Sequence, residues 1–239
     1  MSFVHGSSGR FYVNGFNLSA FLKSVSGSEE IEAHDSTTFG ATAKTYVPGL
    51  VDATLSAEGL FSGAVAATDA VLSAALRGRT PVLWNWLPAG DGDGAFGYGM
   101  SAISTSYEIE TPVDDLVSVS TEAQSNTGME RTQVLHPLAA QTATGNGVAR
   151  DHGAATTAGG AGYLQVMAAS GTTPNLVARV QHSVDNSVWV DLITFAAVTA
   201  ANVAQRLTVA GTVNRWTRTT WAITGTTPSF TLFAAFGRN

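Results

Sequence analysis

Apolar and polar residues alternate along three segments of the first half of the chain, at 51–61, 103–110 and 117–124. A two-residue period puts successive side chains on opposite faces of a β-strand, so each segment is expected to have one apolar and one polar face. Along 103–110 the apolar face is expected to carry Ile103, Thr105, Tyr107 and Ile109. A more uniformly apolar strand is predicted at 81–87.

Two local signals add a turn and a helix. The dipeptide Asn14-Gly15 lies between short apolar runs within 10–18, which predicts a β-hairpin because both turn residues need a positive φ. Residues 68–77 carry an apolar stripe at helical spacing and are followed by Gly78, a residue typical of the position after a last helical turn.

The second half of the chain has the pattern of short strands separated by turns. The predicted strands are 163–168, 176–183, 188–195, 205–209, 216–223 and 229–236. Residues 141–162 are rich in Gly, Ala and Thr and offer little to bury, so they are interpreted as a flexible linker between domains at 1–140 and 163–239. The expected fold is mainly β: an N-terminal β-sandwich or barrel with one packed α-helix, then a C-terminal all-β sandwich or jelly roll.

Composition excludes several classes of protein. The 239 residues include no Cys, which excludes disulfides, a thiol nucleophile and Cys-ligated metal sites. No run of ~18 apolar residues is present, so no membrane insertion is expected. The first residues lack the pattern of a signal peptide, and use without Sec export is expected.

Charge is distributed unevenly along the chain. The net charge is −6, with −9 in residues 1–140 and +3 in 141–239. No polybasic run occurs, which disfavours nucleic-acid binding through phosphate neutralisation.

Candidate catalytic and metal motifs are incomplete. Residues 92–97 match G-x-G-x-x-G, but a strand rather than a helix is expected after them, so a hairpin loop is favoured over a dinucleotide site. Asp91 and Asp93 begin like a calcium loop, yet Ala95 and Ala102 stand where ligands are needed. The five histidines form no metal-binding pair and no G-x-S-x-G motif is present. We therefore expect no enzyme activity, no cofactor and no metal.

The tryptophans leave two interpretations open. A sugar-stacking platform is one, and core packing, which the neighbouring Val, Leu and Thr favour, is the other. The five are Trp84, Trp86, Trp189, Trp216 and Trp221.

Acidic residues gather on the polar faces of the alternating strands, with serines between them. The acids are Asp52, Glu58, Glu108, Glu110 and Glu122. If the strands are neighbours, they form one smooth negative sheet face; an ordinary solvated surface is the alternative.

Several stretches of the chain resemble tail tube (major tail) proteins of long non-contractile-tailed bacteriophages. They are VHGSSGRFYVNGFNLS at 4–19, DSTTFG at 35–40, YVPG at 46–49 and AEGLF at 57–61. The run at 214–238 is similar to sandwich domains appended to phage structural proteins. The resemblance implies a virion protein, made in the host cytoplasm, that forms hexameric rings. These rings stack into a tube that conducts phage DNA and meets the terminator, tape measure and distal tail proteins.

The resemblance also suggests roles for particular residues. A basic wall would bind the duplex, so the five acids named above are expected to face the lumen. Polar loops at 24–45 and 88–99 are the candidates for contacts between rings, with Glu29, Glu30, Glu32, Asp91 and Asp93 in them. The C-terminal half is expected to project outward, either to contact host surface glycans or to decorate the tail. The alternative function is a surface or tail-tip adhesin, a glycan-binding module.

Overall fold

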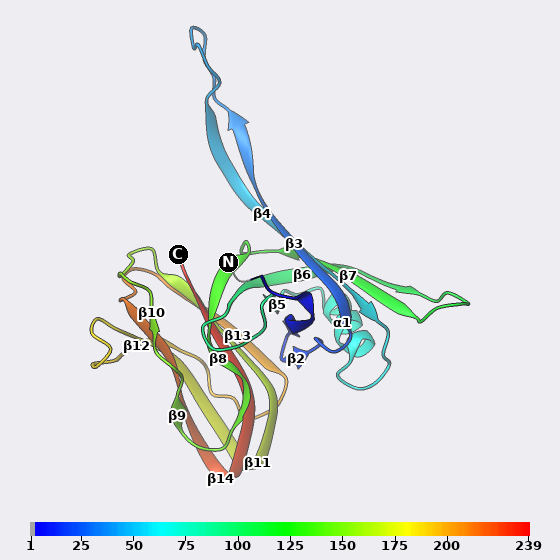
Figure 1. The fold of residues 1–239 in the computed structure, drawn as a ribbon, viewed down its shortest axis with the longest axis vertical. Coiled ribbons are helices and arrows are strands. Elements are labelled where there is room, and N and C mark those ends of the chain that lie inside the picture. The colour runs from blue at the N-terminus through cyan, green and yellow to red at the C-terminus, as the bar shows by residue number, and fades with distance from the viewer. Residues whose placement is uncertain (1–2) are drawn as a thin grey trace. The chain divides into compact units, whose positions relative to one another are not determined.

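Strands make up most of the computed structural model, which describes residues 3–239, and α1 (Thr68–Gly78) is the one α-helix in that range (Figure 1). This confirms the expected mainly-β class with a single helix. No helix in 3–239 is long and apolar enough to cross a membrane.

Contacts within the chain divide it into two units that differ from the expected domains. Unit 1 comprises the residues up to Ala20, Val82–Gly99 and Glu130–Asn239, and unit 2 comprises Phe21–Pro81 and Met100–Met129. The boundary between the two units therefore does not coincide with the change in composition near residue 140. The physical reason is long-range strand pairing, which assigns N-terminal strands to the same sheet as the C-terminal half and which local composition does not report.

Unit 1 is built around two long antiparallel strands. Its elements are η1 (Gly6–Ser8), β1 (Arg10–Val13), β2 (Phe16–Asn17), β5 (Val82–Leu87), the start of β6 (Phe96–Glu110), β8 (Glu130–Gln141), β9 (Gly145–Asn146), β10 (Arg150–Asp151), β11 (Gly160–Ser183), β12 (Val190–Thr194), β13 (Val203–Val209) and β14 (Trp216–Arg238). The strand order is β12-β11-β14-β8-β6-β5-β1-β2, with β13 on β11 and with β9 and β10 on β14. The Asn14-Gly15 turn joins β1 to β2, as predicted.

The strands β11 and β14 each join two segments that the sequence pattern separates. Their pairing shifts register near Ser170–Asn175, where Gly171 and Gly225 take positive φ values of 111° and 125°. A glycine at positive φ bends or bulges a strand without ending it. The strands predicted at 163–168 and 176–183 are therefore one bent strand, β11. Those predicted at 216–223 and 229–236 are likewise one bent strand, β14.

The core of unit 1 is apolar and aromatic, and only some of the tryptophans belong to it. Trp84 and Trp221 are buried, and Trp221 belongs to the same apolar cluster as Leu176 and Phe230. The other three, Trp86, Trp189 and Trp216, are partly exposed.

The Gly/Ala/Thr segment 141–162 is bound to β14 over part of its length. Gly145 and Asn146 pair with Trp221 and Thr220, and the Trp221 indole N–H donates to the Ala143 carbonyl at 3.0 Å. Small residues suit this close packing, because a Cβ on Gly145 would lie 2.9 Å from the Trp221 ring. The segment therefore differs from the flexible linker that its composition suggests.

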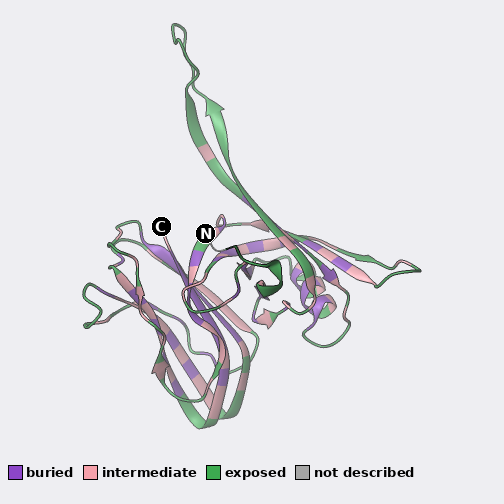
Figure 2. Ribbon diagram, in the orientation of Figure 1, coloured by how far each residue is buried: buried purple, intermediate pink, exposed green. Residues whose placement is uncertain are grey.

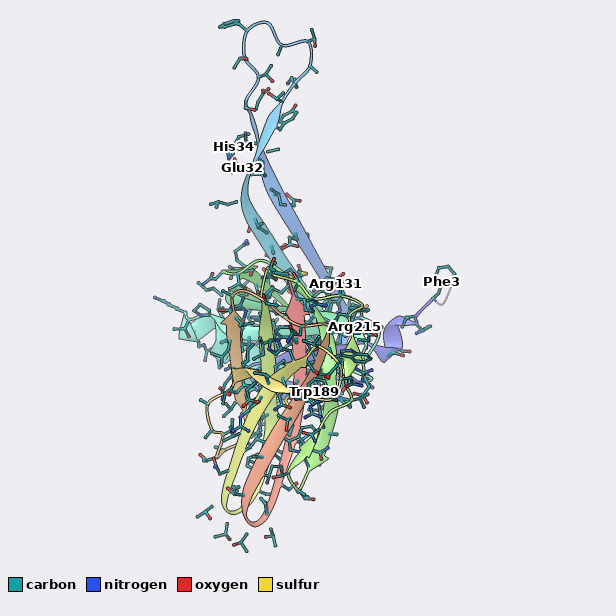
Figure 3. All side chains as sticks on the ribbon, turned by 90° about the vertical axis from the view of Figure 1, so that its left-hand side faces the viewer. Phe3, Glu32, His34, Arg131, Trp189 and Arg215 are labelled. Carbon is teal, nitrogen blue, oxygen red and sulfur yellow. The ribbon has the colours of Figure 1, made fainter. Side chains whose placement is uncertain are left out.

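Unit 2 contains a four-stranded antiparallel sheet and α1. The sheet order is β3 (Leu22–Asp35), β4 (Tyr46–Leu60), β7 (Ser118–Ser125) and the later part of β6. The far parts of β3 and β4 pair only with each other and form a hairpin, residues 28–52, which we call the arm. Its residues are almost all exposed (Figure 2), and Figure 3 labels Glu32 and His34 on it.

The helix packs its apolar stripe toward the sheet. Val71, Leu72 and Ala75 are buried, and α1 contacts β7. The helix runs one residue beyond the predicted 68–77, and Arg79 rather than Gly78 takes the left-handed conformation, with φ 50°.

Candidate functional site: the polar face of the unit 2 sheet

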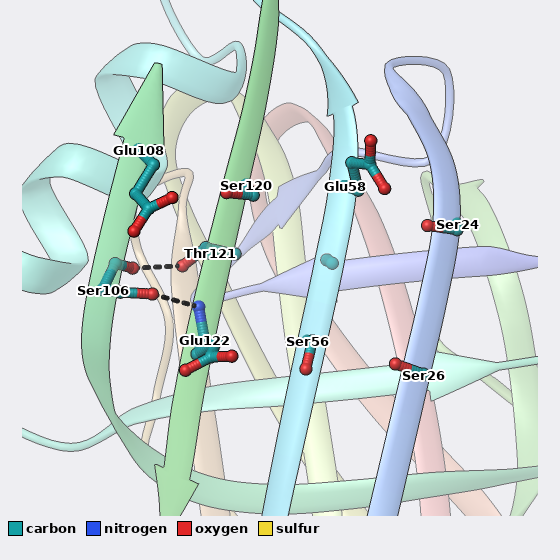
Figure 4. A pocket seen from close by; sticks show the side chains of 10 residues that line it. Ser24, Ser26, Ser56, Glu58, Ser106, Glu108, Ser120, Thr121 and Glu122 are labelled. Carbon is teal, nitrogen blue, oxygen red and sulfur yellow. Dashed lines mark hydrogen bonds between the residues drawn. The ribbon is translucent and has the colours of Figure 1, made fainter. Parts of the chain in front are cut away.

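Carboxylates and hydroxyls line one face of the unit 2 sheet in two neighbouring rows (Figure 4). In the first row Glu58 of β4 pairs with Ser120 of β7, which pairs with Glu108 of β6. The second row is Ser26, Ser56, Glu122 and Ser106, in that order across β3, β4, β7 and β6. A shallow hollow lies over these residues.

The two rows alternate charge and hydroxyl across the sheet. Like charges directly opposite each other on neighbouring strands are destabilising. Here a serine separates Glu58 from Glu108, and serines lie on both sides of Glu122. The arrangement therefore gathers negative charge on one face while no two of these three carboxylates are direct cross-strand partners.

The remaining two expected acids lie on the same face. Asp52 is in phase with Ser56 and Glu58 along β4 and accepts a hydrogen bond from the side-chain amide of Gln124. Glu110 is paired with Ser118. The register thus brings together all five acids that the strand alternation selects.

A β-bulge in β6 changes which side chains share the polar face. The pairing with β7 shifts register between Ser104 and Ser106, so Ile103 lies opposite Gln124 while Ser104 is buried. The expected apolar set along 103–110 is wrong at this end, because one extra residue reverses the alternation. The backbone N–H of Glu122 donates to Ser106 Oγ at 3.1 Å, which helps to fix the bulge.

The opposite face of the same sheet is apolar and packed. Leu55, Ala57, Val119 and Ala123 are buried. Tyr107 on this side donates its hydroxyl to Asp69 of α1 at 2.9 Å. Burial, followed by that hydrogen bond, raises the pKa of Tyr107. The packed face holds the strands in register and so fixes the positions of the polar side chains on the other face.

The acids predicted in the loop at 24–45 lie on β3 in the arm region, in three different settings. Glu29 accepts the backbone N–H of Met129 at 2.9 Å, Glu30 lies opposite Asp52, and Glu32 lies 3.6 Å from His34. The segment is thus largely strand, and its acids do not form one cluster.

The two acids predicted in the loop at 88–99 belong to unit 1 and are engaged there. Asp91 Oδ2 accepts the Tyr12 hydroxyl at 2.8 Å and the Leu138 N–H at 3.0 Å. Asp93 forms an ion pair with Arg150 at 3.0 Å. Their contacts are internal, and a role between rings remains a prediction.

One edge of the unit 2 sheet has no strand on its outer side. Among the described residues, β3 pairs with β4 alone. An unpaired edge of 14 residues presents backbone donors and acceptors that another strand can bind.

The side chains that line the polar face are of few chemical kinds. Hydroxyls and carboxylates line it, without a histidine, and no cluster of three metal-ligating side chains occurs in residues 3–239. Its chemistry is that of a smooth acidic surface, which repels polyanions and leaves serine hydroxyls to bind water.

Comparisons with known proteins give remote structural likenesses. No family model matches the chain, and no curated protein matches it. A chain in the virion of a native gene transfer agent particle is 16% identical with a TM-score of 0.41, over 47% of this chain and 85% of that one. The SPP1 tail tube protein is 12% identical with a TM-score of 0.44, over 53% and 77%. The Dit protein of SPP1, from a hub adsorption apparatus, is 10% identical with a TM-score of 0.36, over 96% and 99%. With TM-scores below 0.5, none of these likenesses assigns a function to the chain.

Proposed function

We propose that this chain is a structural subunit of a bacteriophage tail, and that six copies join into rings that stack into a tube conducting the phage DNA. The proposal rests above all on the sheet face of unit 2, where acids and serines line a hollow that contains no Lys or Arg. The phage-like stretches at 4–19, 35–40, 46–49 and 57–61 also support it. The subunit belongs to the virion and would meet the terminator, tape measure and distal tail proteins.

The polar face suits the wall of a DNA conduit. Duplex DNA carries about one negative charge per 1.7 Å of its axis, and each contact between a phosphate and Lys or Arg releases counterions and adds affinity. A wall of Glu and Ser forms no such contacts. In this proposal Asp52, Glu58, Glu108, Glu110 and Glu122 face the bore and keep the duplex mobile.

The open edge of β3 suits ring formation. Proteins rarely leave a long edge strand uncovered, since it promotes uncontrolled association. Pairing with the sheet of the next subunit would cover the edge, and a closed ring leaves no edge free.

The arm suits the contact between rings. It carries exposed apolar side chains, among them Ile31, Leu50 and Phe39, and a lone two-stranded hairpin is only marginally stable in water. Packing against the next ring would bury these side chains and hold the arm in one conformation.

Electron microscopy of the purified protein tests the assembly, with two neighbouring proline variants in β3 as a matched pair. Consecutive residues of a strand direct their N–H groups to opposite sides, and proline has no N–H group. Of the two variants Val25→Pro and Ser26→Pro, one therefore removes a hydrogen bond to β4. The other removes only a donor on the outer edge, where the next subunit would pair. We expect rings or tubes from the wild type, and a folded monomer from the variant that blocks the outer edge. A wild type that stays monomeric at every concentration, or assembly that is unaffected by both substitutions, would refute ring closure through β3.

A cysteine-labelling experiment tests which face lines the bore. Because the chain has no Cys, Ser120→Cys and Ser187→Cys each introduce one thiol, the first on the polar face and the second on an exposed turn of unit 1. In assembled tubes we expect a small maleimide to reach both thiols and a maleimide on a bulky polymer to reach only Cys at 187. Equal labelling of both by the bulky reagent would place the acidic face outside.

Glycan binding by unit 1 is the second candidate function, as in a tail-tip adhesin. It is favoured by the partly exposed Trp189 and Trp216, which lie outside the core.

A further inference from the structure

A second polar surface lies on unit 1, on the face of β12, β11 and β14 turned away from its core. The core-facing side of these strands carries Val180, Trp221 and Ile193. The side chains that alternate with these point to the other face of the sheet. Together with Trp189, which precedes β12 (Figure 3), they form what we call the tryptophan face. It consists of Arg179, Gln181, Trp189, Asp191, Trp216 and Arg218.

The polar groups of the tryptophan face are joined in a continuous chain of contacts. Asp191 accepts the Gln181 amide N–H at 2.7 Å and forms an ion pair with Arg179 at 3.3 Å. The Gln181 carbonyl oxygen accepts Arg218 Nε–H at 3.0 Å. The Arg218 guanidinium then lies 4.2 Å from the centre of the Trp189 ring. Each group thus has its orientation fixed by the next, which lowers the entropic cost of binding a ligand.

Arg218 differs from most arginines of unit 1 because it has no carboxylate partner. Arg10, Arg150, Arg179, Arg206 and Arg215 each pair with an Asp or Glu. Arg218 bonds only the neutral Gln181 through Nε, and its two terminal nitrogens make no hydrogen bond within residues 3–239. Burial lowers the pKa of Arg218, as expected for a partly dehydrated cation. A guanidinium with a free pair of terminal N–H groups binds a carboxylate through two parallel hydrogen bonds.

Aromatic surface lies on the same face as this cation. Trp189 and Trp216 are partly exposed, and the Trp189 ring lies against the Arg218 guanidinium. Trp combines a large apolar ring with low conformational entropy, so such rings bind the C–H faces of flat ligands. Asp191 and Arg179, with side chains 48% and 34% exposed, offer an acceptor and a donor at the same surface.

We propose that the tryptophan face binds an acidic saccharide, a pyranose that carries a carboxylate. The carboxylate takes the terminal N–H pair of Arg218, the sugar ring packs on Trp189, and hydroxyls bind Asp191 and Arg179. The site suits both parts of such a ligand, because the unpaired Arg218 matches the carboxylate and the exposed aromatic surface matches the sugar ring. The proposal deepens the second candidate function and does not depend on ring formation.

The test compares oligogalacturonate with its methyl ester, which has the same rings without the charge, by calorimetric titration into the full chain. We expect the acid to bind and the ester to bind about tenfold or more weakly, a ratio that corresponds to about 1.4 kcal/mol. Arg218→Gln should remove the preference for the acid. Trp189→Ala should weaken both ligands, and Arg131→Gln, an exposed arginine of unit 1 outside the face, should change neither.

Other outcomes would overturn this assignment. No binding of oligogalacturonate at millimolar concentration, equal binding of acid and ester, or unchanged binding by Arg218→Gln each contradicts it. Self-association that Trp189→Ala abolishes, without saccharide binding, would show that the face binds a second copy instead. Because unit 1 carries the face and β3 carries the ring edge, the proline variants of β3 should bind the saccharide normally. Failure of one proposal is therefore distinguishable from failure of the other.

Discussion

The two units of the molecule use charged residues in opposite ways. Unit 1 has six carboxylates and eight arginines, and five of those carboxylates form ion pairs with arginine. Unit 2 has twelve carboxylates and four Lys or Arg, and its described ion pairs are Lys44–Asp35 and His34–Glu32, at the far end of β3. Charges in unit 1 mainly pair with one another, whereas most carboxylates of unit 2 have no ionic partner among the described residues.

The comparison separates residues that hold the fold from residues that shape a surface. In unit 1, removal of a charge leaves a partner unpaired. On the polar face of unit 2, it removes a charge that has no ionic partner. The first should therefore alter stability, and the second should alter behaviour toward polyanions. The predictions below test this difference, and because all five tryptophans lie in unit 1, their fluorescence reports on that unit alone.

The largest effect is expected from Glu130→Ala in unit 1. Glu130 bonds Arg206 and the Tyr163 hydroxyl, and the Glu130 and Arg206 side chains are each only 16% exposed. Loss of one partner of a buried pair leaves an uncompensated charge, which costs about 3–5 kcal/mol. Urea unfolding followed by tryptophan fluorescence measures it. The double variant Glu130→Ala, Arg206→Met should recover much of the loss, and a single-variant effect below about 1 kcal/mol would contradict the role of the pair.

Acid should destabilise unit 1 before unit 2. Burial lowers the pKa values of His136, His152 and His182, that of His152 to about 4 from 6.5. Between pH 6.5 and about pH 4 the unfolded chain therefore binds more protons than the folded chain. The free energy of unfolding falls as the pH drops through this range. Unit 2 has one histidine, the exposed His34. Thermal unfolding followed by tryptophan fluorescence should have a lower midpoint at pH 5 than at pH 7, and His152→Asn should reduce that difference.

A smaller effect is expected from Tyr107→Phe in unit 2. The variant removes the hydrogen bond to Asp69 and should cost about 1 kcal/mol. Circular dichroism during urea unfolding measures the change, with Tyr46→Phe on the exposed arm as the matched control. Equal effects of the two substitutions would show that the Tyr107–Asp69 bond does not contribute.

The smallest effect on stability is expected from the triple variant Glu58→Gln, Glu108→Gln, Glu122→Gln. These side chains are exposed and have serine neighbours, so the free energy of unfolding should change by less than about 0.5 kcal/mol per site. Replacement of the same three residues by Lys should instead make assembled tubes bind duplex DNA, with an affinity that falls steeply as salt rises. A large loss of stability in the Gln variant would end the distinction drawn between the units.

Local patterns in the sequence predicted what depends on neighbouring residues. Alternation located β4 and β7, helical spacing located α1, and the phase of Asp52 and Glu122 set the polar face. These features arise within one strand or one helix, where side-chain direction follows from position.

Features set by distant pairing were not predictable in this way. The bulge at Ser104–Ser106 depends on the partner strand, and the assignment of β1, β5 and β8 to unit 1 depends on contacts with strands far away in the chain. The chain of contacts from Asp191 to Arg218 spans three strands, and neither composition nor spacing reports it. Partly exposed Trp189 and Trp216 differ from the favoured core interpretation for the same reason, since burial depends on what packs above a residue.

The alternation of serine and glutamate across the unit 2 sheet has an evolutionary consequence. Since Glu58, Glu108 and Glu122 form no ion pair, and the packed residues lie on the other side of the strands, substitutions at these positions are nearly neutral for folding. Selection can therefore adjust the electric potential of this surface one residue at a time while the scaffold beneath stays unchanged.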